Sequence, residues 1–337
     1  MTMPTHYRKL VVVDMAGDFR AATRVVESPL PQPGEGQVLV RNHFMGVNGS
    51  DPVAIKGGYG ISQVPFDVGL DSGGEVVAVG PGVADLKVGD AVLVFGFGGG
   101  YGEYRVAQAA HVYHVPTLTP ELMSAFIPAL TALVAFEESG FLKSGETVLV
   151  TAAAGGVGSY AVQIAKRAGN HVIGTTGSAE KVEWLRSIGC DRVIDYRSED
   201  LSAILASEYP AGIDVAFDTV GRSTFDIALA HLATFGRLLT IGATAEYGDG
   251  VVWEQVTGVR IYQTLLGKSA TISASTLALY PPAVWQRYLD QIAGMLDADE
   301  LRAMIDPVPF TGLEAVPDAV EHLLAGTNRG KVIVRCS

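Results

Sequence analysis

A run of small residues, Ala153-Ala154-Gly155-Gly156-Val157-Gly158, stands between a strand-forming segment (146–152) and a helix-forming one (155–168). Its spacing matches the pattern G-x-G-x-x-G, with alanine in the first position. Small residues at these positions let the chain turn sharply, let the backbone approach a pyrophosphate and let the helix sit close to the strand. The first amides of the helix then face the phosphate groups. The motif therefore predicts a bound dinucleotide.

The residues after the next strand (171–176) indicate which dinucleotide to expect. A site for NAD carries Asp or Glu at the end of that strand, about 20 residues beyond the glycines, to bind the ribose 2′-hydroxyl. Residues 174–178 contain no carboxylate, and Lys181 follows them. A lysine attracts a 2′-phosphate, and Tyr196 and Arg197 after the following strand could reach the same group. We expect NADPH, with the alternative that Lys181 is only a solvated residue of its helix.

The elements that position these residues change in character near residue 123. Beyond it, apolar strands and helices alternate, which indicates an α/β fold with a parallel sheet covered on both faces. Before it, short strand-forming runs are separated by Gly, Pro and Asp, which is typical of a β-rich domain. A final helix (317–326) and strand (331–336) are expected to return to that first domain. The sequence therefore predicts two domains, one of them discontinuous.

Motifs that carry a family resemblance are spread over nearly the whole chain. They are GVNGSD (46–51), GLDSGGEVVAVG (69–80), GGYGEYRV (99–106), PALTAL (128–133), VLVTAAAGGVGSYAVQIAK (148–166), LRSIGCDRVIDY (185–196), FDTVG (217–221) and NRGKVIV (328–334). With them the chain resembles the medium-chain dehydrogenase/reductase superfamily, and within it the zinc-independent quinone oxidoreductases, closest to the prostaglandin reductase branch. The resemblance implies a GroES-like catalytic domain over 1–123 and 276–337, and a doubly wound Rossmann domain that binds NADPH over 124–275.

The resemblance also implies residues that contact the cofactor. Gly177 stands where a serine is expected in the closest relatives, and Ser178 is the candidate to replace its hydrogen bond to the 2′-phosphate. The other contacts implied in this way are Thr131 and Asn328 near the nicotinamide, Lys181 and Tyr196 at the 2′-phosphate and adenosine ribose, and Thr219, Ile241 and Tyr247 along the cofactor channel.

No metal site is expected. Zinc enzymes of this superfamily carry a cysteine in the motif that here reads 46–50, and a His-Glu pair where this chain has Leu70-Asp71. Asn48 and Leu70 are not zinc ligands, since catalytic zinc is held by Cys, His or carboxylate. The two cysteines of the whole chain cannot form a four-cysteine structural site.

Without a Lewis acid, a conjugated enone, enal or quinone is the expected acceptor, because hydride adds to carbon and the charge moves to a distant oxygen. One or two hydrogen-bond donors can stabilise that oxygen. The candidates are Asn48 and Tyr59. Alternatively, Asn48 is a turn residue that binds its own backbone, and Tyr59 shapes the pocket without donating a proton.

Two other functions stay open, namely an NADPH-binding protein with a structural or regulatory role and little turnover, and an enoyl-thioester reductase. The net charge of −12 argues against nucleic acid and anionic membranes as partners. Two cysteines and no signal-peptide pattern favour the cytoplasm. Residues 265–276 are expected to form an edge strand that pairs with its own copy in a homodimer. The alternative is a strand shielded by a loop of the same chain.

Overall fold

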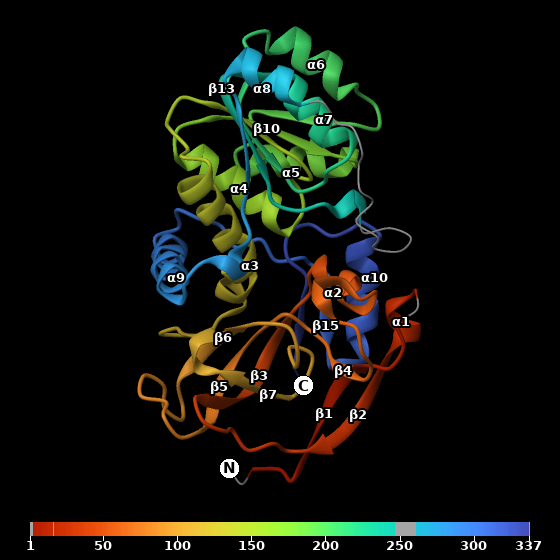
Figure 1. Ribbon diagram of the computed structural model, residues 1–337, viewed down its shortest axis with the longest axis vertical. Helices are drawn as coiled ribbons and strands as arrows, with labels where there is room; N and C mark the ends of the chain where they lie inside the picture. The colour runs from red at the N-terminus through yellow and green to blue at the C-terminus, as the bar shows by residue number, and fades with distance from the viewer. Residues whose placement is uncertain (1–2, 16, 247–260, 337) are drawn as a thin grey trace. The chain divides into compact units, whose positions relative to one another are not determined.

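The computed structural model describes residues 3–15, 17–246 and 261–336 (Figure 1). The described residues up to 126 and from 305 onward form one unit, which we call the β-rich unit, and those from 127 to 304 form a second, the parallel-sheet unit. The first division lies close to the expected boundary at 123. Residues 276–304, expected in the catalytic domain, group here with the parallel-sheet unit, because Arg287 and Tyr288 both bind Glu138 of that unit.

The β-rich unit contains two sheets. β16 (Ile333–Arg335) pairs antiparallel with β3 (Gln37–Gly46), with Val334 opposite Met45, so the carboxyl-terminal segment belongs to this unit. The larger sheet has the order β15 (Phe310–Thr311), β16 (Ile333–Arg335), β3 (Gln37–Gly46), β5 (Asp71–Val79), β6 (Ala91–Phe95), β8 (Val112–His114), with β7 (Tyr104–Gln108) also paired to β3. The smaller sheet has the order β2 (Thr23–Pro29), β1 (His6–Val12), β4 (Phe66–Asp67).

Short helices connect and cover these strands. An apolar core forms where α10 packs on the sheets, with Leu10, Met45 and Val320 among its buried residues. The helices are α1 (Phe19–Ala22), α2 (Ser50–Ile55), η1 (Gly58–Gly60), η2 (Ala109–His111), η7 (Leu313–Ala315) and α10 (Val316–Leu324).

In the described part of the parallel-sheet unit, six strands form one sheet and all of them are parallel, which confirms the predicted Rossmann-type fold. Successive residues Val148, Leu149 and Val150 are fully buried. Because side chains alternate between the two faces of a strand, both faces of the sheet are covered. The strand order is β11 (Arg192–Asp195), β10 (His171–Thr176), β9 (Thr147–Val150), β12 (Ile213–Asp218), β13 (Leu232–Thr240), β14 (Thr271–Ala274).

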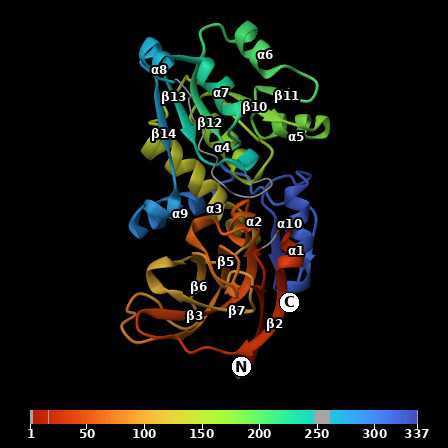
Figure 2. The same ribbon diagram turned by 45° about the vertical axis from the view of Figure 1, so that its right-hand side comes forward.

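Helices connect these strands and cover both faces of the sheet (Figure 2). Residues 120–139, predicted as one helix, form α3 (Pro120–Val134) and the wider turn η3 (Ala135–Ser139). The other helices are α4 (Gly156–Arg167), η4 (Ala179–Lys181), α5 (Val182–Ser187), α6 (Leu201–Glu208), α7 (Ser223–Ala230), η5 (Thr244–Glu246), α8 (Tyr262–Lys268), η6 (Leu277–Leu279) and α9 (Pro282–Asp297).

The predicted strand 265–276 is only partly a strand. Residues 271–274 form β14 at the end of the strand order, as expected for an edge, but Leu265–Lys268 belong to α8. Leucine and lysine are good helix formers. The Lys268 ammonium also anchors the end of this helix by donating to the carbonyl oxygens of Ala230 (2.7 Å) and Leu232 (2.5 Å).

One described helix, Pro120–Ser139, is long and apolar enough to cross a membrane, and 78% of its most apolar window is buried within the protein. Such burial is usual for a core helix of a globular protein.

Candidate active site

The predicted phosphate-binding motif forms a tight turn between β9 and α4. Ala152 has a left-handed backbone (φ 44°), and Gly155 is extended where α4 begins. A β-carbon on Gly158 would lie 2.4 Å from the carbonyl oxygen of Ala152, so a side chain there would push the helix away from the strand. Ala153 is fully buried beneath the turn. The structure thus requires small residues at these positions, as the motif predicted.

The amino end of α4 suits a bound phosphate. Gly155 offers no side-chain cap, and the first turn of the helix contains no acidic residue. The first amides of a helix have no partner within the helix, and together they carry a partial positive charge. The turn therefore has the donors that a pyrophosphate would need.

The residues expected at the 2′-phosphate follow two adjacent strands. β10 and β11 pair in parallel, with Thr176 opposite Asp195, and the amide of Tyr196 donates to the carbonyl oxygen of Thr176 (3.0 Å). Ser178 begins the turn that leads to Lys181, whose amide donates to the Ser178 carbonyl oxygen (3.0 Å). The structure thus brings the segments of Ser178, Lys181 and Tyr196 to one corner of the sheet.

Asp195, the last residue of β11, has its carboxylate turned toward the loop that follows the strand. Asp195 Oδ1 accepts a hydrogen bond from the amide of Arg197 (3.1 Å). This contact occupies one oxygen of the Asp195 carboxylate at the carboxyl end of the strand.

Two further residues predicted to contact the cofactor, Thr219 and Ile241, directly follow the carboxyl ends of β12 and β13. Thr219 is buried, its amide donates to Thr151 Oγ1 (2.9 Å), and its hydroxyl donates to the Thr151 carbonyl oxygen (3.3 Å). Ile241 is half-buried, and its amide donates to the carbonyl oxygen of Asp218 (2.8 Å). Ligands of open parallel sheets bind at the carboxyl ends of the strands. Tyr247 lies outside the described residues.

The two candidates for the nicotinamide end belong to different units. Thr131 of α3 is half-buried in the parallel-sheet unit and donates its hydroxyl to the carbonyl oxygen of Ile127 (2.7 Å). Asn328 is buried in the β-rich unit, where its Nδ2 donates to the carbonyl oxygen of Gly330 (2.9 Å). Their contact with a cofactor stays a prediction.

Asn48 lies at the centre of a polar cluster in the β-rich unit. Its Nδ2 donates to Asp71 Oδ1 (2.5 Å) and to the carbonyl oxygen of Gly46 (3.2 Å), and its Oδ1 accepts from Lys331 Nζ (2.6 Å). Lys331 and Asp71 are both buried, with Nζ 3.5 Å from Asp71 Oδ2. Both amide hydrogens and the amide oxygen of Asn48 therefore have partners within this unit, which fixes the orientation of the side chain.

A second buried carboxylate completes this cluster. Asp51 Oδ2 accepts from the amide of Asn48 (2.8 Å) and from the hydroxyl of Tyr101 (2.6 Å). Burial raises the pKa of Asp51 to about 7, although these two hydrogen bonds lower it. A β-carbon on Gly46 would lie 2.2 Å from Asp71 Oδ2, so the cluster also requires glycine at position 46.

Sequence reasoning did not identify Lys331, Asp51 or Tyr101 as members of this cluster. Asp51 and Lys331 stand in the motifs GVNGSD and NRGKVIV, but nothing in either motif indicates that the two would meet. One feature of the sequence could have pointed to them. Asp51 and Lys331 stand among apolar or small residues, and a charged residue in such a segment is usually buried only with a partner.

Tyr59 projects from η1 with a left-handed backbone (φ 59°, ψ 24°). Its side chain is 51% exposed, and its ring lies against Phe97, with 4.7 Å between ring centroids. A left-handed backbone is unfavourable for a residue with a β-carbon, so the surrounding turn must hold it. The ring of Tyr59 is thus presented to its surroundings rather than packed in the core.

Within the described ranges, no group of three or more His, Cys, Asp or Glu side chains is placed to hold a metal ion. At the positions where zinc relatives carry ligands, Asn48 binds Lys331 and Leu70 is buried. The absence of a metal stays a prediction for experiment.

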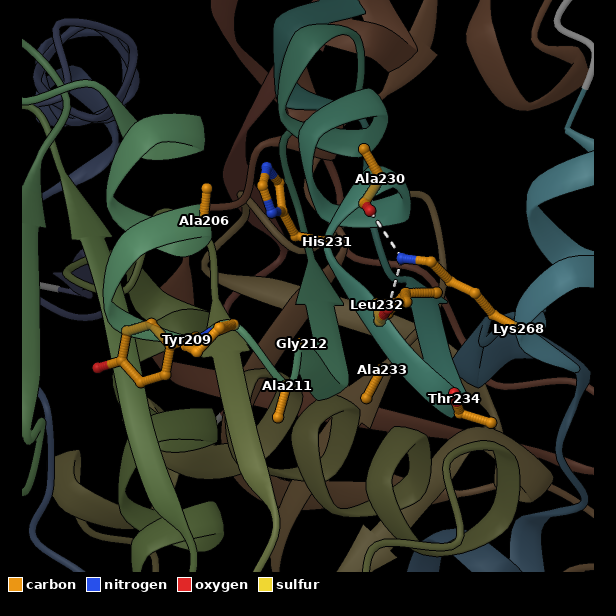
Figure 3. A pocket seen from close by; sticks show the side chains of 11 residues that line it. Ala206, Tyr209, Ala211, Gly212, Ala230, His231, Leu232, Ala233, Thr234 and Lys268 are labelled. Atoms are coloured by element: carbon orange, nitrogen blue, oxygen red, sulfur yellow. Dashed lines mark hydrogen bonds between the residues drawn. The ribbon is translucent and has the colours of Figure 1, made fainter.

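A cavity of about 300 Å³ lies at the opposite edge of the parallel sheet, at the amino ends of β12 and β13 (Figure 3). Gly212, His231 and Leu232 line it, together with Lys268, whose ammonium is bound to two backbone carbonyls. Since the phosphate-binding turn follows the carboxyl end of β9, this cavity is not part of the expected cofactor site.

The fold and the phosphate-binding turn together are those of a two-domain dehydrogenase or reductase. Residues 34–117 match the family model described as alcohol dehydrogenase GroES-like domain, and residues 156–294 match the one described as zinc-binding dehydrogenase. The chain belongs to the medium-chain dehydrogenase/reductase superfamily, in the group of quinone oxidoreductases and prostaglandin reductases.

Individual relatives cover nearly the whole chain. A probable quinone oxidoreductase of Leishmania amazonensis is 41% identical over 99% of this chain and 99% of its own length. Prostaglandin reductase-3 of Bos taurus is 41% identical over 98% of this chain and 90% of its own. A mycobacterial protein solved in complex with NADPH has a TM-score of 0.86 and 29% identity, covering 98% of this chain and 99% of that one.

Proposed function

We propose that this chain is a zinc-independent, NADPH-dependent reductase of quinones and α,β-unsaturated ketones or aldehydes. The balanced reaction is NADPH + H⁺ + acceptor → NADP⁺ + reduced acceptor, which is a hydroquinone or a saturated carbonyl compound. The observation that carries the proposal is that the segments of Ser178, Lys181 and Tyr196 follow two adjacent parallel strands, with no carboxylate in 174–178, in the unit that holds the predicted phosphate-binding turn. The quinone oxidoreductase and prostaglandin reductase names of the relatives support the acceptor class.

The parallel-sheet unit would bind the cofactor, which supplies the hydride. The amides at the start of α4 would hold the pyrophosphate, with Gly155, Gly156, Val157 and Gly158 allowing close approach. Lys181 would bind the 2′-phosphate with a charge-assisted hydrogen bond, Ser178 would add a neutral one, and Tyr196 would lie at the adenosine ribose. Thr131, Thr219, Ile241, Tyr247 and Asn328 are proposed to line the remaining channel.

Asn48 and Tyr59 are the proposed groups on the acceptor side. Asn48 would donate Nδ2–H to the acceptor oxygen in place of its longer bond, 3.2 Å, to Gly46. The Lys331 ammonium on Oδ1 would strengthen this donor, because hydrogen bonds in a chain polarise one another. The hydroxyl of Tyr59, or water, would deliver the proton that balances the hydride.

Further proposals concern location and assembly. With a net charge of −12, we propose small molecules rather than nucleic acid or membranes as partners, in the cytoplasm. We also propose a homodimer that pairs two copies of β14, because β14 ends the strand order of the parallel sheet.

An assay of NADPH consumption with quinones, enones and an enoyl thioester would test the function. We expect quinones and enones to be reduced, with NADPH strongly preferred over NADH. If the protein binds NADPH but reduces none of these acceptors, the binding-protein alternative holds. If only the enoyl thioester is reduced, the chain is a thioester reductase instead.

A further inference from the structure

Two aromatic rings stack on each other at the surface of the β-rich unit. Tyr59 and Phe97 come from loops 38 residues apart, and their rings lie 4.7 Å apart with 31° between the ring planes. Both remain exposed, Tyr59 by 51% and Phe97 by 42%. A single exposed aromatic side chain is common, but two that stack while keeping ring surface in solvent form a flat apolar area that suits a planar ligand.

The turn that carries Tyr59 is held rigidly. Tyr59 has a positive φ, between Gly57 (φ 83°) and Gly60 (φ 77°). Gly58 packs so closely on α2 that a β-carbon would lie 2.4 Å from Val53 Cγ1 and 2.8 Å from the Val53 carbonyl oxygen. A left-handed tyrosine is unfavourable on its own and persists where surrounding structure enforces it. The direction of the Tyr59 ring is therefore set by the fold.

The loop that carries Phe97 is held by a buried arginine. The guanidinium of Arg105 donates to the carbonyl oxygen of Gly96, at the start of this loop, and to that of Leu70 (3.4 Å), in the segment before β5. The amides of Gly96 and Gly98 donate to the carbonyl oxygens of Leu70 (3.0 Å) and Gly69 (3.3 Å). These hydrogen bonds hold the backbone on both sides of Phe97.

The same loops connect the two rings to Asn48. Leu70 precedes Asp71, whose carboxylate accepts from Asn48 Nδ2, and Tyr59 follows Asn48 by 11 residues through α2. The rings and the amide thus lie on neighbouring segments of a single unit, the Phe97 loop through its hydrogen bonds to Gly69 and Leu70 and the Tyr59 turn through α2.

We propose that Phe97, stacked with Tyr59, is a specificity-determining residue that binds the planar conjugated ring of the acceptor and favours fused-ring quinones over acyclic enones. This inference rests on the proposed reductase function. Offset and tilted stacking of aromatic rings adds attraction beyond burial of apolar area. An acyclic enone has too little flat surface to gain much from it.

The test compares a naphthoquinone with methyl vinyl ketone as acceptors for the wild type and for Phe97→Ala, Phe97→Leu and Phe97→Tyr. We expect Phe97→Ala to raise KM for the naphthoquinone about tenfold, with kcat changed much less and KM for methyl vinyl ketone within about twofold. Phe97→Leu should resemble Phe97→Ala, because it keeps bulk without a ring, and Phe97→Tyr should resemble the wild type.

Phe235→Ala is the matched control, because Phe235 is a more exposed phenylalanine near the amino end of β13, away from the carboxyl ends of the strands. Thermal unfolding and NADPH binding of each variant show whether it is folded.

A wild type that reduces neither acceptor overturns the proposed function. A wild type that reduces both, with Phe97→Leu and Phe97→Ala leaving the ratio of the two KM values unchanged, overturns the specificity role alone, as does a wild type that reduces only methyl vinyl ketone.

Discussion

The phenol of Tyr196 occupies the space that a side chain on Gly177 would need. A β-carbon on Gly177 would lie 2.4 Å from Tyr196 Oη and 2.6 Å from Cζ, far inside non-bonded contact. Gly177 follows β10 and Tyr196 follows β11, so the contact joins the ends of two adjacent parallel strands. Glycine at 177 therefore lets the tyrosine ring rest on the backbone at the corner where the 2′-phosphate is proposed to bind.

Gly177→Ala should displace this ring and weaken NADPH binding by about three- to tenfold, since one or two interactions of moderate strength would be lost. Fluorescence titration with NADPH measures the effect. The same substitution in a Tyr196→Ala background should have almost no further effect, because the two residues act through one contact. Additive losses in the double variant would contradict the proposed link between them.

Lys181→Ala should weaken NADPH binding by about tenfold or more, because a charge-assisted hydrogen bond contributes roughly 1.5–3 kcal/mol. NADH lacks the 2′-phosphate, so its affinity should hardly change. Lys143→Ala is a suitable control, as Lys143 is an exposed lysine before the amino end of β9 in the same unit. Equal affinity of the wild type for NADPH and NADH would rule out the assignment.

Exhaustive chelation should leave the reductase activity unchanged, and metal analysis should find far less than one zinc per chain. The reason is that Asn48 and Leu70 stand at the positions where zinc relatives carry ligands, and neither binds zinc. One tightly held zinc per chain, or activity lost to a chelator and restored by zinc, would refute the prediction.

Asp51 should make the stability of the protein depend on pH. Burial raises the pKa of Asp51 from 3.8 to about 7 in the folded protein. Between about pH 4 and about pH 7 its carboxyl group is therefore protonated in the folded state and ionised in the unfolded state. Stability should therefore fall as pH rises through this window, and the decline should end above it. Urea unfolding of Asp51→Asn should show a shallower decline, whereas the exposed Asp85→Asn should follow the wild type. Identical pH profiles for Asp51→Asn and the wild type would contradict this role.

Local spacing was sufficient to predict the tight turn between β9 and α4, because the small residues there satisfy constraints within one strand–turn–helix unit. It could not predict that Lys331 binds Asn48, since 283 residues separate them and only the antiparallel pairing of β16 with β3 brings them together. The stacking of Phe97 on Tyr59 likewise joins two loops that lie 38 residues apart in the sequence. Leu265–Lys268 were predicted as strand because their composition suits either state, and the anchoring contacts of Lys268 are not visible in sequence.

The last prediction concerns the proposed dimer and the backbone groups on the side of β14 that pairs with no strand among the described residues, called here its open edge. The amide of Ser275 donates to the carbonyl oxygen of Thr240 (3.2 Å), so Ser275 faces β13. Because backbone groups alternate in direction along a strand, Thr271 and Ser273 also face β13, and Ile272 and Ala274 face the open edge.

Ala274→Pro should therefore remove a donor from the edge without removing a bond to β13. We expect sedimentation at micromolar concentration to show a dimer for the wild type and a shift to monomer for Ala274→Pro, with the unfolding temperature of the parallel-sheet unit little changed. Thr271→Pro is the contrasting variant, since it should break a bond to β13 and lower stability as well. The pairing of two β14 edges is wrong if the wild type is monomeric, or if Ala274→Pro folds normally and stays as dimeric as the wild type.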